Sequence, residues 1–159
     1  MDTAEFPFAD LVERLDHVSV AVRDIRAAAG VAELLGGRFR DGGSSFGRDF
    51  RWAQWDLPGG KLEMIAPVDL DDEGNFLVRF LRERGEGLHH LTVKVSDLER
   101  AVELARAGGY EIVGVDVTNE GWKEAFVHPR SAAGVLIQLA EFTDGPPPPP
   151  KTLDEVLGP

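Results

Sequence analysis

Polar and apolar residues alternate in two stretches of the chain that share one pattern. The first stretch reads LDHVSVAVRD and the second LHHLTVKVSD, and in both a histidine stands seven residues before an aspartate: His17 before Asp24, and His90 before Asp97. Because side chains along a β-strand point alternately to opposite faces, each stretch predicts a strand with one aliphatic face and one more polar face that carries the histidine. His89 points to the aliphatic face and is expected to be structural.

A helical run follows each of these strands. Asp24 and Asp97 are suited to cap the helix N-termini, since their carboxylates can accept hydrogen bonds from free amides of the first turn, and a Gly-Gly pair ends each run. Strand-like segments make up the rest of each half: FRWAQWDL and KLEMIAP in the first, and YEIVGVDV, KEAFVHP and GVLIQLAEF in the second. The pattern therefore predicts an α+β chain of two tandem βαβββ modules.

The chain is expected to contain one folded domain, over residues 14–142. Its modules cover about residues 14–68 and 87–142, and the amphipathic segment NFLVRFLRERG between them predicts a short connecting helix. Residues 1–13 form an N-terminal extension. Residues 143–159 contain five consecutive prolines, which favour extended polyproline II geometry, so we expect a flexible, solvated tail there.

Composition narrows the classes of function. A chain of 159 residues with 43% hydrophobic content can bury one sizeable core. The net charge of −11 opposes binding to nucleic acids and to anionic membranes. The absence of cysteine excludes disulfides, thiolate nucleophiles and cysteine-ligated metals. The sequence has neither a secretory signal pattern nor a run of about 18 apolar residues, so a cytoplasmic location is expected.

A polar residue interrupts the last strand-like segment of each module. Glu63 and Gln138 follow His17 and His90 at nearly the same distance along the chain. Both stand in otherwise aliphatic strands, where a polar group without a partner is costly. Both side chains therefore need partners, and a cation is one candidate.

These features resemble the vicinal oxygen chelate superfamily, which includes glyoxalases, extradiol dioxygenases and bleomycin-resistance proteins. Within it, the stretches FLRERGEGLHHL, LEMIAP and HPRSAAGVLIQL are similar to the methylmalonyl-CoA epimerase branch. The resemblance implies an open β-barrel cavity that holds a divalent metal ion, and catalytic roles for Glu63 and Gln138. Two imidazoles and a carboxylate suit Co²⁺, Ni²⁺, Mn²⁺, Fe²⁺ or Zn²⁺. The implied metal ligands are His17, Glu63, His90 and Gln138. For Gln138 the sequence fits a second interpretation equally well, an amide that closes a hydrogen-bond network inside the barrel.

The chain departs from the epimerase branch at two positions. The epimerases have a glutamate where this chain has Gln138, and a second glutamate at the position that aligns with Gly47. An amide is a far weaker proton acceptor than a carboxylate near neutral pH, and epimerisation needs a base and an acid on opposite faces of one carbon. The sequence therefore predicts a retained fold and metal site without the ordinary epimerase machinery.

Three functions fit this pattern. The first is a metal-dependent isomerase or lyase that acts by proton transfer on a small chelating carboxylate or acyl thioester. The second is an Fe²⁺ dioxygenase, because His17, His90 and Glu63 match the set of two histidines and one carboxylate that such enzymes use. The third is a metal-free binding protein of the bleomycin-resistance type. We further expect a small-molecule substrate and a homodimer.

Overall fold

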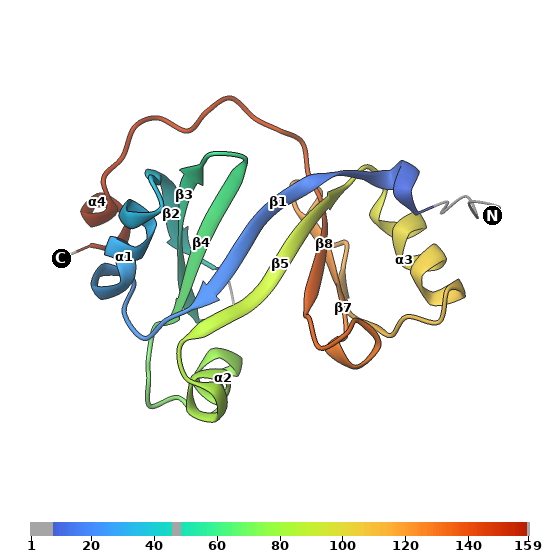
Figure 1. The fold of residues 1–159 in the computed structure, drawn as a ribbon, viewed down its shortest axis with the longest axis horizontal. Coiled ribbons are helices and arrows are strands. Elements are labelled where there is room, and N and C mark those ends of the chain that lie inside the picture. The colour runs from blue at the N-terminus through green and yellow to red at the C-terminus, as the bar shows by residue number, and fades with distance from the viewer. Residues whose placement is uncertain (1–7, 46–48, 159) are drawn as a thin grey trace. The chain divides into compact units, whose positions relative to one another are not determined.

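The computed structural model describes residues 8–45 and 49–158. Within these residues the chain forms eight β-strands, four α-helices and two short 3₁₀ segments (Figure 1). The predicted α+β class with two βαβββ modules is confirmed. In chain order the elements are η1 (Ala9–Leu11), β1 (Val12–Ala21), α1 (Ile25–Leu34), β2 (Arg38–Ser44), β3 (Phe50–Leu57), β4 (Gly60–Pro67), α2 (Phe76–Arg84), β5 (Gly87–Val95), α3 (Leu98–Ala107), β6 (Ile112–Asp116), β7 (Lys123–Val127), η2 (Pro129–Ser131), β8 (Ile137–Glu141) and α4 (Leu153–Leu157).

Contacts between residues divide the chain into two compact units, which we name after the helix that follows the first strand of each module, α1 and α3. Among the described residues, the α1 unit consists of residues 17–45, 49–89 and 145–158. The α3 unit consists of residues 8–16 and 90–144. The division passes through β1 and β5, so both strands contribute residues to both units.

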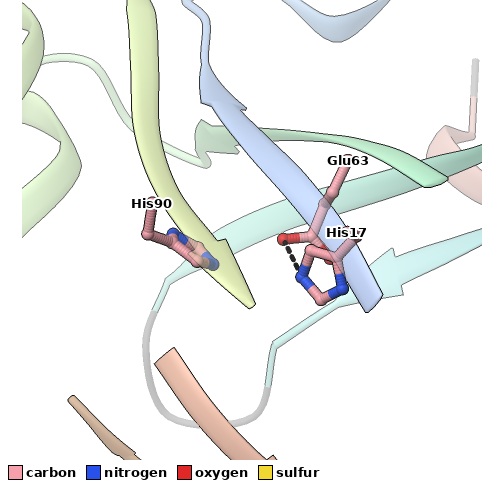
Figure 2. A group of neighbouring side chains, drawn as sticks. All are labelled: His17, Glu63 and His90. Carbon is pink, nitrogen blue, oxygen red and sulfur yellow. Dashed lines mark ion pairs between the residues drawn. The ribbon is translucent and has the colours of Figure 1, made fainter. Parts of the chain in front are cut away.

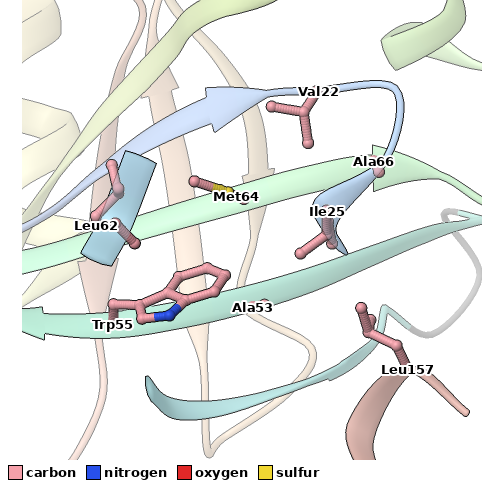
Figure 3. Packing of buried hydrophobic residues seen from close by; sticks show 9 residues of the cluster. Val22, Ile25, Ala53, Trp55, Leu62, Met64, Ala66 and Leu157 are labelled. Carbon is pink, nitrogen blue, oxygen red and sulfur yellow. The ribbon is translucent and has the colours of Figure 1, made fainter. Parts of the chain in front are cut away.

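In the α1 unit the strands follow the order β2-β3-β4-β1. β3 and β4 form an antiparallel hairpin, and β4 pairs parallel with β1, which brings Ser19 opposite Glu63. One face of these strands packs on α1, and their other face carries the alternate residues. The core on the α1 side contains Val22, Ile25, Ala32, Ala53, Trp55, Leu62, Met64, Ala66 and Leu157 (Figure 3).

The segment predicted as a connecting helix forms α2, which covers part of the other face of the α1 unit. The side chain of Asn75 accepts a hydrogen bond from the Leu77 amide and so caps the helix N-terminus. Leu77 and Leu81 then pack against Ala21 and Ile65 of the strands. Phe50 and Trp52 of β3 pack against the same cluster, and polar residues also lie on this strand face.

In the α3 unit the strands follow the order β1-β5-β8-β7-β6. β5 runs parallel to β8, with Thr92 opposite Gln138, and β8 is antiparallel to β7. α3 packs on one face of these strands, so the polar residues that alternate with the core residues belong to the other face. The core on the α3 side contains Val95, Leu98, Ala101, Val102, Ala125, Val127 and Leu139.

Both predicted helix caps are present. The carboxylates of Asp24 and Asp97 accept hydrogen bonds from backbone amides in the first turns of α1 and α3. At the other ends, Gly36 and Gly109 have φ angles of 74° and 87°, a left-handed backbone that glycine adopts without steric cost. The strand, cap and helix of each module thus follow directly from the repeated sequence pattern.

The C-terminal segment differs from the solvated tail that its prolines predict. Beyond them α4 begins with a capping box between Thr152 and Glu155, and its apolar side chains at positions 153, 156 and 157 join the core of the α1 unit. Arg51 donates a hydrogen bond to the carbonyl oxygen of Leu157 at 3.1 Å. In Figure 1 α4 lies beside α1 and β2. The reason is the apolar spacing of TLDEVL, which forms one helical face despite the neighbouring prolines.

We expect Leu157→Ala to lower the free energy of unfolding by about 2 kcal/mol, because the Leu157 side chain is 8% exposed and its loss leaves a gap in the core. Urea unfolding followed by circular dichroism measures the change. Leu34→Ala is the matched control, since Leu34 is 84% exposed and its truncation should cost less than about 0.5 kcal/mol. Equal stability of both variants would mean that α4 does not stabilise the fold.

Candidate functional site

A polar cluster occupies the face of the α1 unit that is opposite α1. His17 is 2% exposed, and its Nε2 atom lies 3.6 Å from Oε1 of Glu63 (Figure 2). The hydroxyl of Ser19 donates to the same oxygen at 3.0 Å, and Nε2 of Gln54 donates to Oε2 of Glu63 at 2.8 Å. Glu63 is therefore held at both carboxylate oxygens beside a buried histidine.

Strand pairing explains why these four residues meet. His17 and Ser19 are two residues apart on β1, so their side chains point to the same face. Glu63 of β4 lies opposite Ser19 on one side and opposite Gln54 of β3 on the other. The cluster follows from the register of three neighbouring strands.

A second polar cluster occupies the corresponding face of the α3 unit. The hydroxyl of Thr92 donates to Oε1 of Gln138 at 2.6 Å, and Nε2 of Gln138 donates to Oε2 of Glu124 at 2.7 Å. All three side chains are buried. His90 is 7% exposed, and its ring lies edge-on to Phe126 with 6.3 Å between the ring centroids.

The two clusters contain the same kinds of side chain, but the carboxylate and the amide have changed places between the third and the last strand. Each has a histidine and, two residues later, a hydroxyl residue on the first strand of its module. The last strand then carries a carboxylate in the α1 unit, Glu63, and an amide in the α3 unit, Gln138. The third strand carries the reverse, an amide in Gln54 and a carboxylate in Glu124.

Sequence reasoning identified the histidines, Glu63 and Gln138 but missed their partners. Ser19 and Thr92 occupy equivalent places in the repeat, two residues after each histidine, so the pattern itself contained this signal. Gln54 and Glu124 give no such signal, because their approach to the last strand depends on strand pairing that the sequence does not display. The residue aligned with the second epimerase glutamate, Gly47, lies outside the described residues.

The pair of histidines at 89 and 90 has two different environments, as the face assignment predicted. The ring of His89 packs against Phe80 and Phe76, with centroid distances of 4.8 and 5.7 Å. Burial lowers the pKa of His89 to about 4, and the nearby carboxylate of Glu63 offsets only part of this effect. His89 is thus a packing residue of the α1 unit that stays neutral at pH 7.

The geometry of the α1 cluster fits a divalent cation. Two ligand atoms bound to one ion at about 2.1 Å in a tetrahedral arrangement lie about 3.4 Å apart, close to the 3.6 Å between His17 Nε2 and Glu63 Oε1. An imidazole nitrogen and a carboxylate oxygen are ligand types that zinc, cobalt, nickel, manganese and iron accept. The hydrogen bonds from Ser19 and Gln54 would hold the carboxylate ready for such an ion.

None of the helices in the described part of the chain has the length and apolar character that crossing a membrane requires.

Known proteins are similar to this chain in sequence and in fold. Residues 16–126 match the model of the Glyoxalase/Bleomycin resistance protein/Dioxygenase superfamily. The ethylmalonyl-CoA/methylmalonyl-CoA epimerase of Cereibacter sphaeroides is 26% identical over 136 residues, which cover 82% of this chain and 99% of that protein. The predicted resemblance to this branch is confirmed.

Solved structures of epimerases superpose on this fold. Methylmalonyl-CoA epimerase from Mycobacterium tuberculosis has a TM-score of 0.73 and 31% sequence identity, covering 84% of this chain and 91% of that chain. The Streptomyces coelicolor methylmalonyl-CoA epimerase, solved in complex with 2-nitronate-propionyl-CoA, has a TM-score of 0.70 and 22% identity, covering 84% of this chain and 99% of that one. The latter shares the fold.

We expect the ring of His89 to titrate with a midpoint near pH 4 rather than its usual 6.5. Because the unfolded chain takes up this proton at higher pH than the folded protein, His89 should reduce stability as the pH falls from about 6.5 to 4. Proton NMR titration measures the midpoint, and the variant His89→Gln assigns the resonance. A midpoint near 6.5 would contradict the packing described for this ring.

Proposed function

Because this chain belongs to the glyoxalase/bleomycin resistance protein/dioxygenase superfamily, we propose that it is a divalent-metal-dependent enzyme that transfers a proton on a small chelating carboxylate or acyl thioester. The observation that carries this proposal is the contact between buried His17 and half-buried Glu63, with the Glu63 carboxylate held by two hydrogen bonds. The ligands of the proposed metal site are His17, Glu63, His90 and Gln138.

The chemistry of these side chains supports the choice of ligands. His17 and His90 would bind as neutral imidazoles, Glu63 would supply the negative charge, and the Gln138 amide oxygen would be a weak fourth ligand. An ion bound there would act as a Lewis acid on a carbonyl oxygen of a chelating substrate. The duplicated sequence also supports the set, because each module contributes one histidine and one polar residue from equivalent strands.

The names of the relatives suggest the class of substrate. The Cereibacter sphaeroides protein is named for ethylmalonyl-CoA and methylmalonyl-CoA, and the Streptomyces coelicolor enzyme was solved in complex with 2-nitronate-propionyl-CoA. A malonyl thioester has a carboxylate and a thioester carbonyl on either side of one carbon, so both oxygens can approach one ion. We therefore favour an acyl thioester of this kind over a simple carboxylate.

The placement of the carboxylate argues against ordinary epimerisation. Inversion at one carbon needs a proton acceptor on one face and a proton donor on the other. Glu63 is a carboxylate beside His17, whereas the residue in the equivalent strand of the second module is the amide Gln138, which takes up no proton near neutral pH. Proton exchange on one face is the reaction that such a site supports.

Metal analysis separates this proposal from its alternatives. A dioxygenase would be favoured if protein purified without added metal contains iron and consumes oxygen. His17, His90 and Glu63 would then be the two histidines and one carboxylate that bind iron in such enzymes. Tight binding of a small molecule by protein that takes up no metal would favour a binding protein. The homodimer and the cytoplasmic location stay predictions from the sequence.

We expect His17→Ala and Glu63→Gln each to weaken Co²⁺ binding by more than about tenfold, because the first removes a proposed ligand and the second removes the negative charge of another. Residues that only hold a ligand in place contribute about tenfold or more. Isothermal titration calorimetry measures the affinities. His128→Ala is the control, because this half-exposed histidine lies at the start of η2 and is not a proposed ligand. Unchanged affinity in both site variants would remove the basis for the metal site.

With methylmalonyl-CoA in deuterated water, we expect the native protein to interconvert the two epimers at least about a hundredfold more slowly than an enzyme with two bases. The estimate follows from the usual contribution of one general acid or base. Mass spectrometry measures deuterium uptake, and a chiral assay measures inversion on the same samples. Rapid inversion by the native protein would show that a second base exists and that the one-face reading is wrong.

A further inference from the structure

We propose that Glu124 is a positioning residue that fixes the orientation of the Gln138 amide, so that Gln138 presents its oxygen, and not its NH₂ group, to the metal site. This inference rests on the proposed function, because the amide oxygen is the atom that a cation binds. It adds to that function a buried residue of β7 that the sequence did not single out.

The Gln138 amide is held at both of its ends. Its Nε2 atom donates to Oε2 of Glu124 at 2.7 Å, and its Oε1 atom accepts from the Thr92 hydroxyl at 2.6 Å. Glu124 and Gln138 are 5% and 6% exposed, and Thr92 is fully buried. Hydrogen bonds to a carboxylate in such surroundings are stronger than those in water, so this contact restrains the amide firmly.

Glu124, and not Thr92, decides which way the amide points. A hydroxyl can donate or accept, so Thr92 alone would tolerate either orientation of the amide. A carboxylate oxygen only accepts, so turning the amide over would bring the Gln138 carbonyl oxygen against Oε2 of Glu124. Nε1 of Trp122 donates to the same Glu124 oxygen at 3.0 Å, which holds the carboxylate in place.

The α1 unit has the same arrangement of hydrogen bonds, with the carboxylate on the last strand and the amide on the third strand. There Oε1 of Glu63 accepts from the Ser19 hydroxyl, and Oε2 accepts from the amide of Gln54. In both units the Oε1 atom of the last-strand residue is bonded to the hydroxyl that follows the histidine by two residues. Glu124 thus turns Gln138 so that its oxygen occupies the place that Oε1 of Glu63 occupies in the α1 unit.

This geometry couples the two positions. Gln138→Glu alone would replace the 2.7 Å hydrogen bond by two facing carboxylates, which repel each other. Glu124→Gln alone would permit both orientations of the Gln138 amide, because an amide can donate as well as accept. The double variant E124Q/Q138E repeats the order of donor and acceptor that Gln54 and Glu63 have in the α1 unit.

Titration of the metal-free protein with Co²⁺, followed by the visible absorption of the ion, tests this role. We expect Glu124→Gln to weaken Co²⁺ binding about tenfold and to shift the absorption band, as the loss of a ligand's hydrogen-bond partner usually does. Glu99→Gln, an exposed position in α3, is the matched control and should bind like the native protein. The double variant E124Q/Q138E should regain at least the native affinity, which a general loosening of the α3 unit would not produce.

A second measurement keeps the test independent of the metal. In ¹⁵N-labelled metal-free protein, the NH₂ group of Gln138 should exchange with solvent at least about tenfold faster in Glu124→Gln, because a hydrogen bond to a charged group is lost. The NH₂ group of Gln54, in the α1 unit, is the internal reference. Unchanged exchange and unchanged Co²⁺ affinity would overturn the positioning role. If the native protein binds no Co²⁺, the proposed function fails, and the exchange rate alone decides whether Glu124 orients Gln138.

Discussion

The need to satisfy buried polar groups controls the site faces of both units. Aliphatic residues pack on the helix side of each set of strands, while the other side contains hydroxyl, imidazole, amide and carboxylate groups away from water. In the part of the chain that the structure describes, no buried side-chain nitrogen or oxygen lacks a hydrogen-bond partner. Because an amide can donate and an ionised carboxylate can only accept, the identity of one residue restricts the identity of its neighbour.

The repeated pattern predicted the features that depend on local sequence. Strand alternation separated His90 from His89, and the aspartate after each strand marked the start of a helix. The pattern could not predict contacts between strands. Gln54 lies directly opposite Glu63, whereas Glu124 lies opposite Ala140 and contacts Gln138 diagonally. In the C-terminal segment a local signal was misleading, because the prolines predicted an extended tail although a short amphipathic helix follows them.

Each cluster contains one carboxylate and one amide, but on different strands. The two clusters therefore carry the same negative charge at different places. In the α1 unit the carboxylate of Glu63 is on the strand next to His17, and its oxygen lies within 3.6 Å of the imidazole. In the α3 unit the carboxylate of Glu124 is one strand farther from β5, and the neutral Gln138 stands between. A cation would therefore be attracted more strongly by the carboxylate of Glu63 than by the neutral amide of Gln138.

The cluster in the α3 unit is a hydrogen-bond network in which the amide of Gln138 is satisfied at both of its ends. Loss of one carboxylate from a satisfied network leaves a donor without an acceptor, which costs about 1–3 kcal/mol when it is buried. In the α3 unit these donors have acceptors. Glu124 accepts hydrogen bonds from both Gln138 and Trp122, and the Thr92 hydroxyl donates to the oxygen of Gln138. The amide at position 138 and the carboxylate at position 124 form a matched pair, so the fold maintains this distribution of charge through the stability of the network itself.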